Sequence, residues 1–410
     1  MSYDSAYDLR TPSADEWPAV SEVMWGAFND TPDDELDAAD RDTWEPERSV
    51  VAERDGVIVG HASSFTRGMV VPGSIVPAAH VTMVSVEATH RRRGLLSGMI
   101  DRLHRDAADR HEPIAVLWAS EGRIYQRFGY GLAARQVHIT AQDSEIIWLD
   151  ARPSVGRVRP VDATSPDSFI DVYEAALPGR PGWSTRDDRW WRYLLTDAPS
   201  RRKDATALRA VLHEDDHGKA DGYLLWRVKG SWEHTGPNGT VSIKELVTTT
   251  PEAYRALWQF ALSVDLTRHV QHWSAAVDEP LQYMIGDPRR LDMTIGDSLW
   301  VRVIDVAGAL EARRYAAPVD LVLDVVDERI SSNHGRWHLT GSADKAACVA
   351  TDEPADLVVD IRALGAAYLG SSTLSALAAA GRVTELRPGA LAAATTAFRW
   401  TVEPSTTDGF

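Results

Sequence analysis

The chain has 410 residues, 44% hydrophobic and 25% charged, and its 60 acidic against 43 basic side chains give a formal net charge of −17. This is the composition of a soluble globular protein long enough for two or three domains, and its acidity argues against nucleic-acid binding, which requires a basic face. No apolar run reaches the length of a membrane span, and the first eight residues lack the basic and apolar segments of a signal peptide. The single cysteine, Cys348, excludes an intrachain disulfide and a cysteine-based metal site, and it suits a reducing compartment, so we expect a cytoplasmic protein.

Apolar spacing in residues 1–150 predicts one α/β unit. In chain order we expect a helix over 13–28, a hairpin of strands 49–53 and 57–65, a strand over 81–86, a helix from 95, a strand over 114–118 and a short helix after 122. The hairpin turn is Arg54-Asp55-Gly56, because glycine accepts the left-handed backbone that tight turns require.

The segment between the strand over 81–86 and the following helix predicts an anion site. Arg91, Arg92 and Arg93 precede Gly94, and an apolar stripe that begins at Leu95 follows at helical spacing. Backbone N–H groups at a helix N-terminus lack partners, the helix dipole favours negative charge, and glycine lets a ligand approach the backbone. The pattern therefore indicates a cradle for a pyrophosphate, with arginines to pair with it. The alternative is an exposed basic helix start that binds nothing.

Residues 155–295 look like a second copy of this unit. Strands over 208–212, 222–228 and 245–250 precede a helix that contains Tyr254. When the copies are superposed, Glu252 falls on Arg91 and Arg255 falls on Gly94. An acid in place of a base repels phosphate, and a bulky side chain excludes it. We therefore predict a repeat that is kept for architecture and binds no cofactor.

Residues from about 300 to the end differ in character. Strands are predicted over 321–326, 335–339 and 357–361, and Ala- and Leu-rich helices over 363–369, 374–380 and 389–398. The resulting domain prediction is 1–150, 151–297 and 298–410. The neighbours of Cys348 are small and apolar, which predicts a buried structural thiol. The thirteen histidines show no metal-ligand spacing, so no metal is expected.

Three segments resemble known families. Arg91-Arg92-Arg93-Gly94-Leu95-Leu96 resembles the Arg/Gln-x-x-Gly-x-Gly/Ala loop of the GNAT acetyltransferases, although Leu96 replaces a small residue. The run Tyr125-Gln126-Arg127-Phe128-Gly129-Tyr130 is similar to the Tyr-x-x-x-Gly-Phe segment of the same enzymes, and Asp360-Ile361-Arg362-Ala363-Leu364-Gly365 resembles the sterol-carrier-like domain. The whole arrangement resembles the Eis family (enhanced intracellular survival): tandem GNAT folds of the α/β (α+β) class, the second degenerate, followed by a sterol-carrier-like α+β domain.

The resemblance implies acetyl-CoA as cosubstrate. Backbone groups of Val84, Ser85 and Val86 would hold the pantetheine arm, and the same groups could serve the oxyanion. Two further sets complete the expected cofactor site: the pyrophosphate loop, and two residues after the next strand. These are Arg91, Arg92, Arg93, Gly94, Leu95, Leu96 and Ser97, and then Ser120 and Glu121.

The resemblance also implies the catalytic groups. Tyr125 would protonate the leaving thiolate, because a phenol with a pKa of about 10 stays protonated at neutral pH. Packing on the core is its alternative role, and Tyr130 is expected to serve mainly in packing. Eis proteins use the carboxylate of the chain terminus as base, and this chain ends in the same residue type, Phe410. The alternative is a frayed tail, since residues 406–409 look flexible.

The acceptor site is expected near Phe28, Asp30 and Trp44, which fall near pocket positions of Eis proteins and adjoin an acidic cluster over 30–42. Acids with aromatic walls suit a polycationic amine such as an aminoglycoside, acetylated at several positions if the pocket is wide. A solvated acidic loop is the alternative, and Gly409 stands where Eis proteins can carry an acid. Protein or peptide lysines form a second acceptor class, and a non-catalytic lipid- or partner-binding protein is a third hypothesis. No membrane or nucleic-acid partner is expected, and the resemblance implies a homohexamer.

Overall fold

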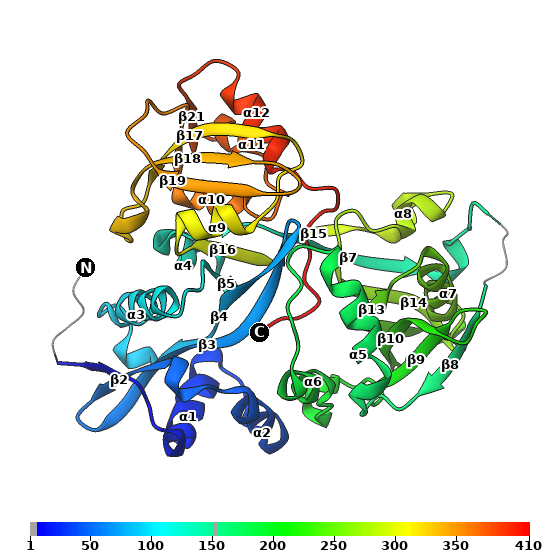
Figure 1. Ribbon diagram of the computed structural model, residues 1–410. Helices are drawn as coiled ribbons and strands as arrows, with labels where there is room; N and C mark the ends of the chain where they lie inside the picture. Colours follow the sequence, from blue (N-terminus) through cyan, green and yellow to red (C-terminus); the bar gives the residue numbers. More distant parts are fainter. Residues whose placement is uncertain (1–5, 151–154) are drawn as a thin grey trace.

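The computed structural model describes residues 6–150 and 155–410, in three α/β units built on two seven-stranded sheets and one five-stranded sheet (Figure 1). The start of the N-terminal segment (residues 1–5) and the first residues after the predicted boundary at 150 lie outside the described residues. Within the described ranges, no helix combines the length and the hydropathy that crossing a membrane requires.

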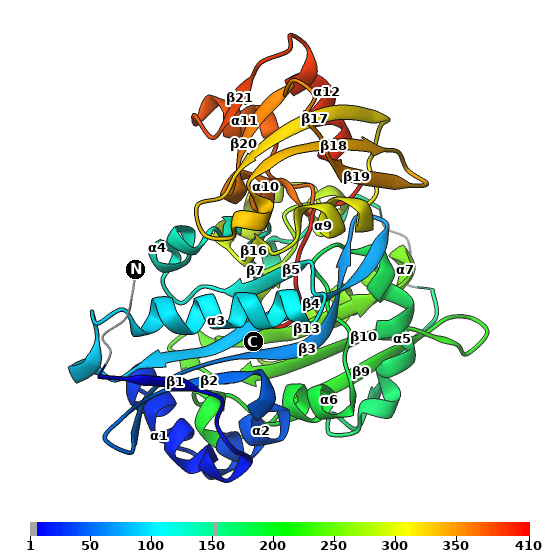
Figure 2. The same ribbon diagram turned by 60° about the vertical axis from the view of Figure 1, so that its left-hand side comes forward.

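The first sheet has the order β1-β2-β3-β4-β5-β16-β6, and helices cover both of its faces. Alternation along β2 shows why: Val50 and Ala52 face the core under α3, whereas Val51 faces the core under α1. Figure 2 shows α3 across one face and α1 with α2 on the other side. The elements of this unit are β1 Asp8–Arg10, α1 Trp17–Phe28, α2 Asp34–Thr43, β2 Ser49–Arg54, β3 Val57–Val71, β4 Ser74–Val86, α3 Leu95–Asp109, β5 Ile114–Trp118, α4 Gly122–Tyr125, β6 Gly131–Leu132 and β16 Leu299–Val303.

The second sheet, of order β15-β7-β14-β13-β10-β9-β8, repeats the parallel pair next to an antiparallel hairpin. The short hairpin of β11 and β12 forms a separate two-stranded sheet. The elements of the second unit are β7 Arg135–Gln142, β8 Arg157–Val161, α5 Ile170–Ala176, α6 Asp188–Leu195, β9 Arg209–Glu214, β10 Ala220–Lys229, β11 Trp232–Glu233, β12 Gly236–Pro237, β13 Gly239–Thr248, α7 Pro251–Leu262, β14 Thr267–Ala275, α8 Leu281–Met284 and β15 Thr294–Asp297.

Strand exchange crosses the predicted domain boundaries. β7 belongs to the predicted segment 1–150 but pairs with β14 of the second sheet, and β16 belongs to the predicted segment 298–410 but pairs with β5 and β6 of the first. β3 and β4 are also longer than expected, because they meet at a tight turn with Gly73 at φ +73°. Apolar alternation identifies a strand, but it does not specify which sheet that strand joins.

The third unit packs helices against a sheet of order β19-β18-β17-β20-β21. Cys348 on β19 is 2% exposed, and burial raises the pKa of its thiol to about 12, as expected of a structural cysteine. The elements are α9 Val306–Ala312, β17 Val319–Val326, β18 Gly335–Gly341, β19 Ala346–Ala350, β20 Leu357–Asp360, α10 Ile361–Ala367, α11 Leu374–Ala379, β21 Val383–Glu385 and α12 Ala390–Phe398.

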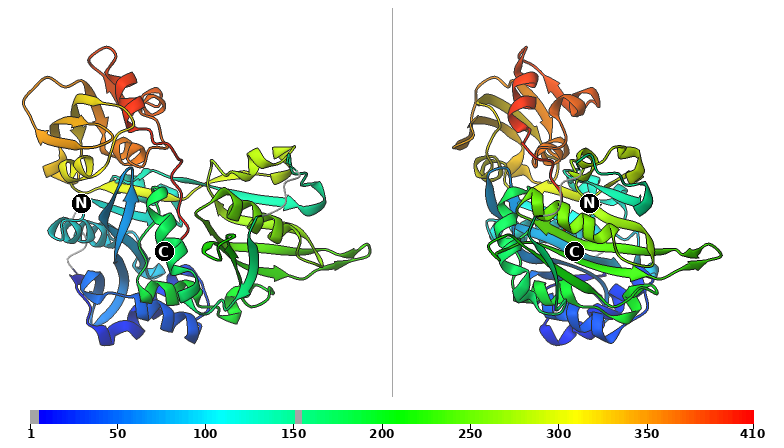
Figure 3. Two further views of the ribbon diagram at one scale, coloured as in Figure 1. Left: turned by 45° about the vertical axis from the view of Figure 1, so that its right-hand side comes forward. Right: turned by 90° about the vertical axis from the view of Figure 1, so that its right-hand side faces the viewer.

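The last residues leave the third unit and run between the other two. After α12, residues 401–410, here called the C-terminal tail, pass down between the first and second units, and the chain ends beside β3 and β4 (Figures 1 and 3). Ser405, Thr406 and Asp408 are all buried. The structure therefore does not show the frayed tail that was the alternative for residues 406–409.

Close backbone contact joins the first and third units, which makes Gly131→Ala a test of the interface. A Cβ at Gly131 would lie 1.9 Å from the carbonyl oxygen of Arg362 in α10. We expect Gly131→Ala to destabilise the protein by roughly 1–3 kcal/mol and to lower its thermal unfolding midpoint, because backbone cannot give way as a side chain can. The matched control is Gly26→Ala in α1, where the added methyl meets nothing within 4 Å and helix propensity improves. Equal midpoints for the two variants would contradict the interface.

Candidate active site

The two central parallel strands of the first sheet diverge toward their carboxyl ends. β4 pairs with β5 from Ala78 opposite Ile114 to His80 opposite Val116, and β4 then continues to Val86. A bulge accompanies the divergence, because Met83 adopts φ +51° and the register against β3 shifts there. The Met83 carbonyl accepts a hydrogen bond from the Nδ1 atom of His61 at 3.1 Å. The edge of β4 is thereby opened to an extended ligand.

The predicted anion loop lies at the end of this opening. Gly94, at φ +82°, is the N-cap residue of α3, and no side chain caps that helix. Arg91, Arg92 and Arg93 are exposed beside it, and the Nε atom of Arg91 donates to the Val86 carbonyl at 3.3 Å. Leu95 is buried in the core, so only its backbone can contact a ligand, whereas Leu96 and Ser97 are half-buried. A helix N-terminus without a side-chain cap, its dipole and the neighbouring arginines fit a pyrophosphate.

The corresponding turn of the second unit is closed. Thr250 caps α7 by accepting from the backbone N–H of Ala253 at 3.2 Å. Arg255 donates to the Asp150 carbonyl and its guanidinium lies 4.9 Å from the Trp148 ring centroid. Thr250 and Arg255 are thus engaged by the protein's own groups, in contrast to the uncapped start of α3, and the loss of cofactor binding in this repeat stays a prediction.

A cavity of about 400 Å³ opens where β4 and β5 diverge. Its walls come from α1 and α2, both strands, α4, the second unit and the C-terminal tail. The lining residues are Met24, Trp25, Phe28, Asp30, Asp40, Val81, Thr82, Met83, Val84, Trp118, Ala119, Ser120, Tyr125, Tyr193, Arg201 and Phe410.

The structure brings together many of the residues predicted from sequence, but not all of them. Val84, Ser120, Tyr125, Phe28, Asp30 and Phe410 line this one cavity. Ser85 is buried in β4, Val86 lies nearer the anion loop, and Glu121 is the N-cap residue of α4. The expectation for Trp44 needs correction: it is 6% exposed and packs on Trp17 and His61, with ring centroids 5.1 and 6.3 Å away, outside the lining of the cavity.

The acidic residues of the cluster over 30–42 make different contacts and have different roles. Asp33 caps α2, Asp37 accepts from Trp17 Nε1 at 2.9 Å, and Asp42 pairs with Arg192 at the surface. Asp40 alone among the acids of α2 is buried and lines the cavity. Burial raises the pKa of its carboxyl to about 6, although Arg201 acts in the opposite direction. Its position four residues after the buried Leu36 was the signal that could have identified it.

Tyr125 presents a protonated phenol to the cavity. Its ring packs edge-on against Tyr130 at a centroid distance of 5.9 Å. Burial raises the pKa of Tyr125 to about 12, and the charge of Glu121 acts in the same direction. The hydroxyl is therefore a proton donor throughout the neutral range. Tyr130 is fully buried and shares a hydrogen bond with His104 at 3.1 Å, which accords with the packing role expected for it.

A buried carboxylate holds the tail in place. Asp408 is 3% exposed and accepts from Arg67 at 2.6 Å, from Trp190 Nε1 at 2.9 Å and from Arg186. Arg186 also pairs with Glu245 of β13, so two guanidiniums meet two carboxylates. Burial by itself would raise the pKa of Asp408, but Arg186 and Arg67 outweigh burial and hold it well below its ordinary value.

The docked tail places Phe410 in the cavity. Its ring lies 4.8 Å from that of His80. His80 is fixed by the Ala78 carbonyl at 3.0 Å and by Ser184 Oγ at 2.8 Å, and burial lowers its pKa to about 3, so its ring is neutral. The family resemblance led us to expect the chain end in the active site, but no local signal identified the pair of Arg67 and Asp408, which are 341 positions apart.

Comparison with known proteins agrees with the fold and identifies the family. Residues 8–133 and 182–303 each match a model described as an acetyltransferase (GNAT) domain, and residues 306–407 match a sterol carrier protein domain. An uncharacterized N-acetyltransferase of Streptomyces avermitilis is 42% identical, covering 98% of this chain and 99% of its own. N-acetyltransferase Eis of Mycobacterium tuberculosis is 34% identical over 92% of each chain.

Solved structures give the same result. Eis1 from Mycobacterium abscessus superposes with a TM-score of 0.84 at 34% identity, over 98% of this chain and 100% of its own. A GCN5-related N-acetyltransferase from Anabaena variabilis shares the fold, with a TM-score of 0.86 at 21% identity over 98% and 100% of the two chains. The fold and site define a tandem GNAT acyltransferase with a sterol-carrier-like domain. More specifically, the chain belongs to the Eis family of N-acetyltransferases.

Asp408→Asn tests whether the charge pairs dock the tail. Removing one carboxylate leaves Arg67 and Arg186 buried with a single anion, which costs about 3–5 kcal/mol when a buried pair is broken. Undocking of the tail relieves that cost, so we expect hydrogen exchange of residues 403–410 to accelerate strongly.

The matched control is Asp42→Asn, which removes a partly exposed partner of Arg192 worth about 0–1 kcal/mol. Unchanged protection of the tail in Asp408→Asn would contradict the proposed docking.

Proposed function

We propose that this chain transfers acetyl from acetyl-CoA to primary amines of polycationic acceptors such as aminoglycosides, at several positions where the cavity admits more than one orientation. The observation that carries the proposal is the convergence of Tyr125 and the chain-terminal Phe410 on one acidic cavity at the divergence of β4 and β5. Acetyl transfer needs a proton donor and a base on opposite sides of a positioned thioester.

The geometry supports a direct transfer. Val84 to Val86 would hold the pantetheine arm by their backbone, and Gly94 to Ser97 with the three arginines would hold the pyrophosphate. The Phe410 carboxylate, through water, would take a proton from the ammonium. The amine nitrogen then attacks the thioester carbonyl carbon, and backbone N–H groups at the opening stabilise the oxyanion. As the carbon–sulfur bond breaks, Tyr125 protonates the departing thiolate, and the second proton released by the acetylated nitrogen passes through water and restores the Tyr125 phenol.

Charge supports a cationic acceptor. Asp30, Asp40 and the chain-terminal residue Phe410 line the cavity together with one arginine, the exposed Arg201. Protein or peptide lysines would satisfy the same charges and form the second candidate class. From the resemblance to the Eis family, we also propose that the protein is cytoplasmic and assembles as a homohexamer. A lipid- or partner-binding protein without catalysis is the third candidate, for which the sterol-carrier-like domain is the supporting feature.

Thiol release from acetyl-CoA separates these candidates. The assay compares kanamycin, a lysine-rich histone-like peptide and no acceptor, with mass spectrometry of the products. Release with kanamycin supports the leading proposal, and release with the peptide alone supports the second. No release with either acceptor, together with uptake of a fluorescent lipid, would replace both with the binding protein.

Tyr125→Phe and a one-glycine extension after Phe410 test the two catalytic assignments. Loss of a positioned acid or base costs about 10²–10⁴-fold in turnover, so we expect kcat to fall by at least about a hundredfold in each variant. Tyr130→Phe is the matched control, because it removes a neighbouring buried phenol that does not line the cavity, and its kcat should stay within about twofold. Wild-type turnover in the extended chain would remove Phe410 from the mechanism.

Acceptor affinity should depend on pH through Asp40. Its carboxyl, with a pKa of about 6, is charged above that pH and neutral below it, so the KM for kanamycin should rise several-fold between pH 7.5 and 5.5. Asp40→Asn should raise KM at pH 7.5 and flatten this dependence.

Stability gives a second measurement of the same carboxyl. In the folded protein its pKa lies above the unfolded value of about 3.9. The free-energy cost of burying its charge therefore grows as the pH rises from 4 to 6 and has its full value above pH 6. Asp40→Asn should therefore melt higher than wild type at pH 7.5 and equally at pH 4. A pH-independent difference in melting would show that charge is not the cause.

A further inference from the structure

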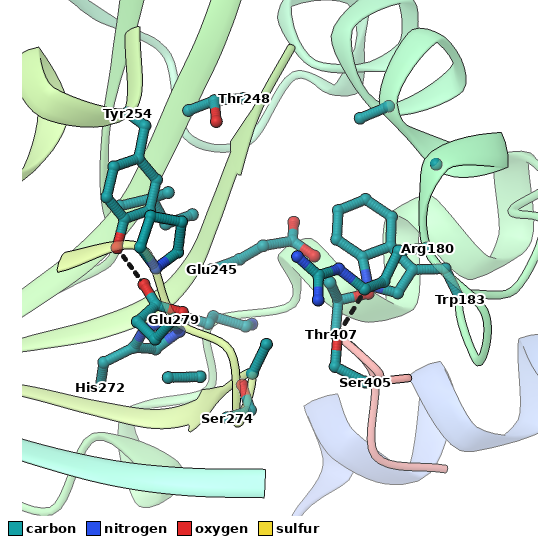
Figure 4. Close-up of a pocket in the computed structure, with 17 residues that line it drawn as sticks. Arg180, Trp183, Glu245, Thr248, Tyr254, His272, Ser274, Glu279, Ser405 and Thr407 are labelled. Carbon is teal, nitrogen blue, oxygen red and sulfur yellow. Dashed lines mark hydrogen bonds between the residues drawn. The ribbon is translucent and has the colours of Figure 1, made fainter. Parts of the chain in front are cut away.

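The second unit retains a cavity at the place where its own parallel strands diverge. β13 pairs with β14 from Gly239 opposite Thr267 to Ile243 opposite His272, and a cavity of about 240 Å³ lies beyond the last pair. In Figure 4, Tyr254, Glu279 and His272 lie on one side of it, and Arg180, Trp183 and Ser405 lie on the other. Thr250 caps the following helix and Arg255 is already engaged, so a pyrophosphate is not the ligand we expect at this cavity.

A buried carboxylate without a cationic partner faces this space. Glu279 is 5% exposed, and its side chain accepts a hydrogen bond from the Tyr254 hydroxyl. The Ala276 backbone and the charge of Arg180 also favour its ionised form, but no cation lies within ion-pair distance of it among the described residues. Arg180 also lines the cavity, but it is engaged by Asp278 at 2.5 Å and by the Glu403 carbonyl at 2.8 Å. Burial raises the pKa of Glu279, which reports the cost of leaving its charge uncompensated.

The other charges that line the cavity already have partners. Glu245 pairs with Arg186 and accepts from Tyr223 at 2.8 Å, and Lys244 donates to the Leu194 carbonyl. Glu279 is therefore the carboxylate of this cavity that has no ion pair within 4 Å among the described residues, and Lys244 is held by a neutral carbonyl.

Neutral polar groups complete the lining of the cavity. His272 is 7% exposed, and burial lowers its pKa to about 4, so the ring is neutral. Its Nδ1 atom has no hydrogen-bond partner within the described structure. The hydroxyl groups of Thr248 and Ser274 lie on the two strands, and Thr407 comes from the tail. A ligand would find one anion and several neutral hydrogen-bonding groups here.

We propose that this cavity binds a small hydroxylated molecule with a protonated primary amine, whose ammonium pairs with Glu279. The cavity volume lies just below the roughly 300 Å³ at which pockets for drug-sized ligands begin, so a single amino sugar or an amino alcohol is the expected size. Ser405 and Thr407 belong to the tail that carries Phe410, so the ligand contacts the segment that ends in the candidate active site.

Calorimetric titration of the full chain with glucosamine, in the absence of acetyl-CoA, tests the proposal independently of catalysis. Glucose is the matched neutral probe, and ethanolamine and methylammonium are smaller amines. We expect at least one amine to bind, with affinity reduced about tenfold or more in Glu279→Gln, and glucose to bind about tenfold or more weaker than glucosamine. The control variant is Glu252→Gln, which removes an exposed acid of α7 and should leave the affinity unchanged.

Equal amine affinity in wild type and Glu279→Gln would overturn the proposal, as would no binding of any of the three amines. A crystal of the wild-type protein soaked in glucosamine decides the matter even if Glu279→Gln fails to fold. Density with its nitrogen within hydrogen-bond distance of Glu279 supports the site, and a cavity that holds only water refutes it.

Discussion

The candidate active site depends on a pairing of two guanidiniums with two carboxylates in the interior. Arg67 comes from β3, Arg186 and Glu245 from the second unit, and Asp408 from the tail, and all are largely buried. A lone charge in that position would be prohibitively expensive, whereas the balanced set satisfies itself by hydrogen bonds. The guanidiniums also lie over aromatic rings, Arg67 at 4.0 Å from Trp190 and Arg186 at 3.8 Å from Tyr173. All three units must therefore be assembled before the chain end can reach the cavity.

The tandem repeat shows how one architecture is used in two ways. Both sheets separate a parallel strand pair at the carboxyl end, and both openings leave a cavity. The difference lies in the following helix: Gly94 leaves the N-terminus of α3 uncapped, whereas Thr250 caps α7 and Arg255 covers the approach. The second unit has instead become a support, because it supplies Arg186 to the tail and Tyr193 and Arg201 to the first cavity.

Local sequence signals predicted the local structure well. The strand at 114–118, the start of α3 at Leu95 and the hairpin turn at Gly56 follow from apolar spacing and glycine, and the structure confirms them. The tandem fold with a sterol-carrier-like domain is likewise confirmed. Features that depend on packing between distant segments could not be predicted, namely the exchange of β7 and β16 and the docking of Asp408. Trp44 shows the same limit, because an aromatic residue beside an acidic helix can face either the pocket or the core.

Asp408 and Asp40 are both buried beside the candidate active site, but their pKa values are shifted in opposite directions. The difference distinguishes a carboxylate that supports the structure from one that is available to bind a ligand. Asp408 meets two guanidiniums and an indole N–H, so its charge is fixed across the range in which proteins function. Asp40 is nearly as buried, yet the structure gives it no ion pair within 4 Å among the described residues, and its pKa rises to about 6. A group that destabilises the folded state at neutral pH is expected where a ligand will supply the missing partner. Asp40 shares the cavity with Arg201, and it is the buried carboxylate there that would meet the cationic amine of the proposed function.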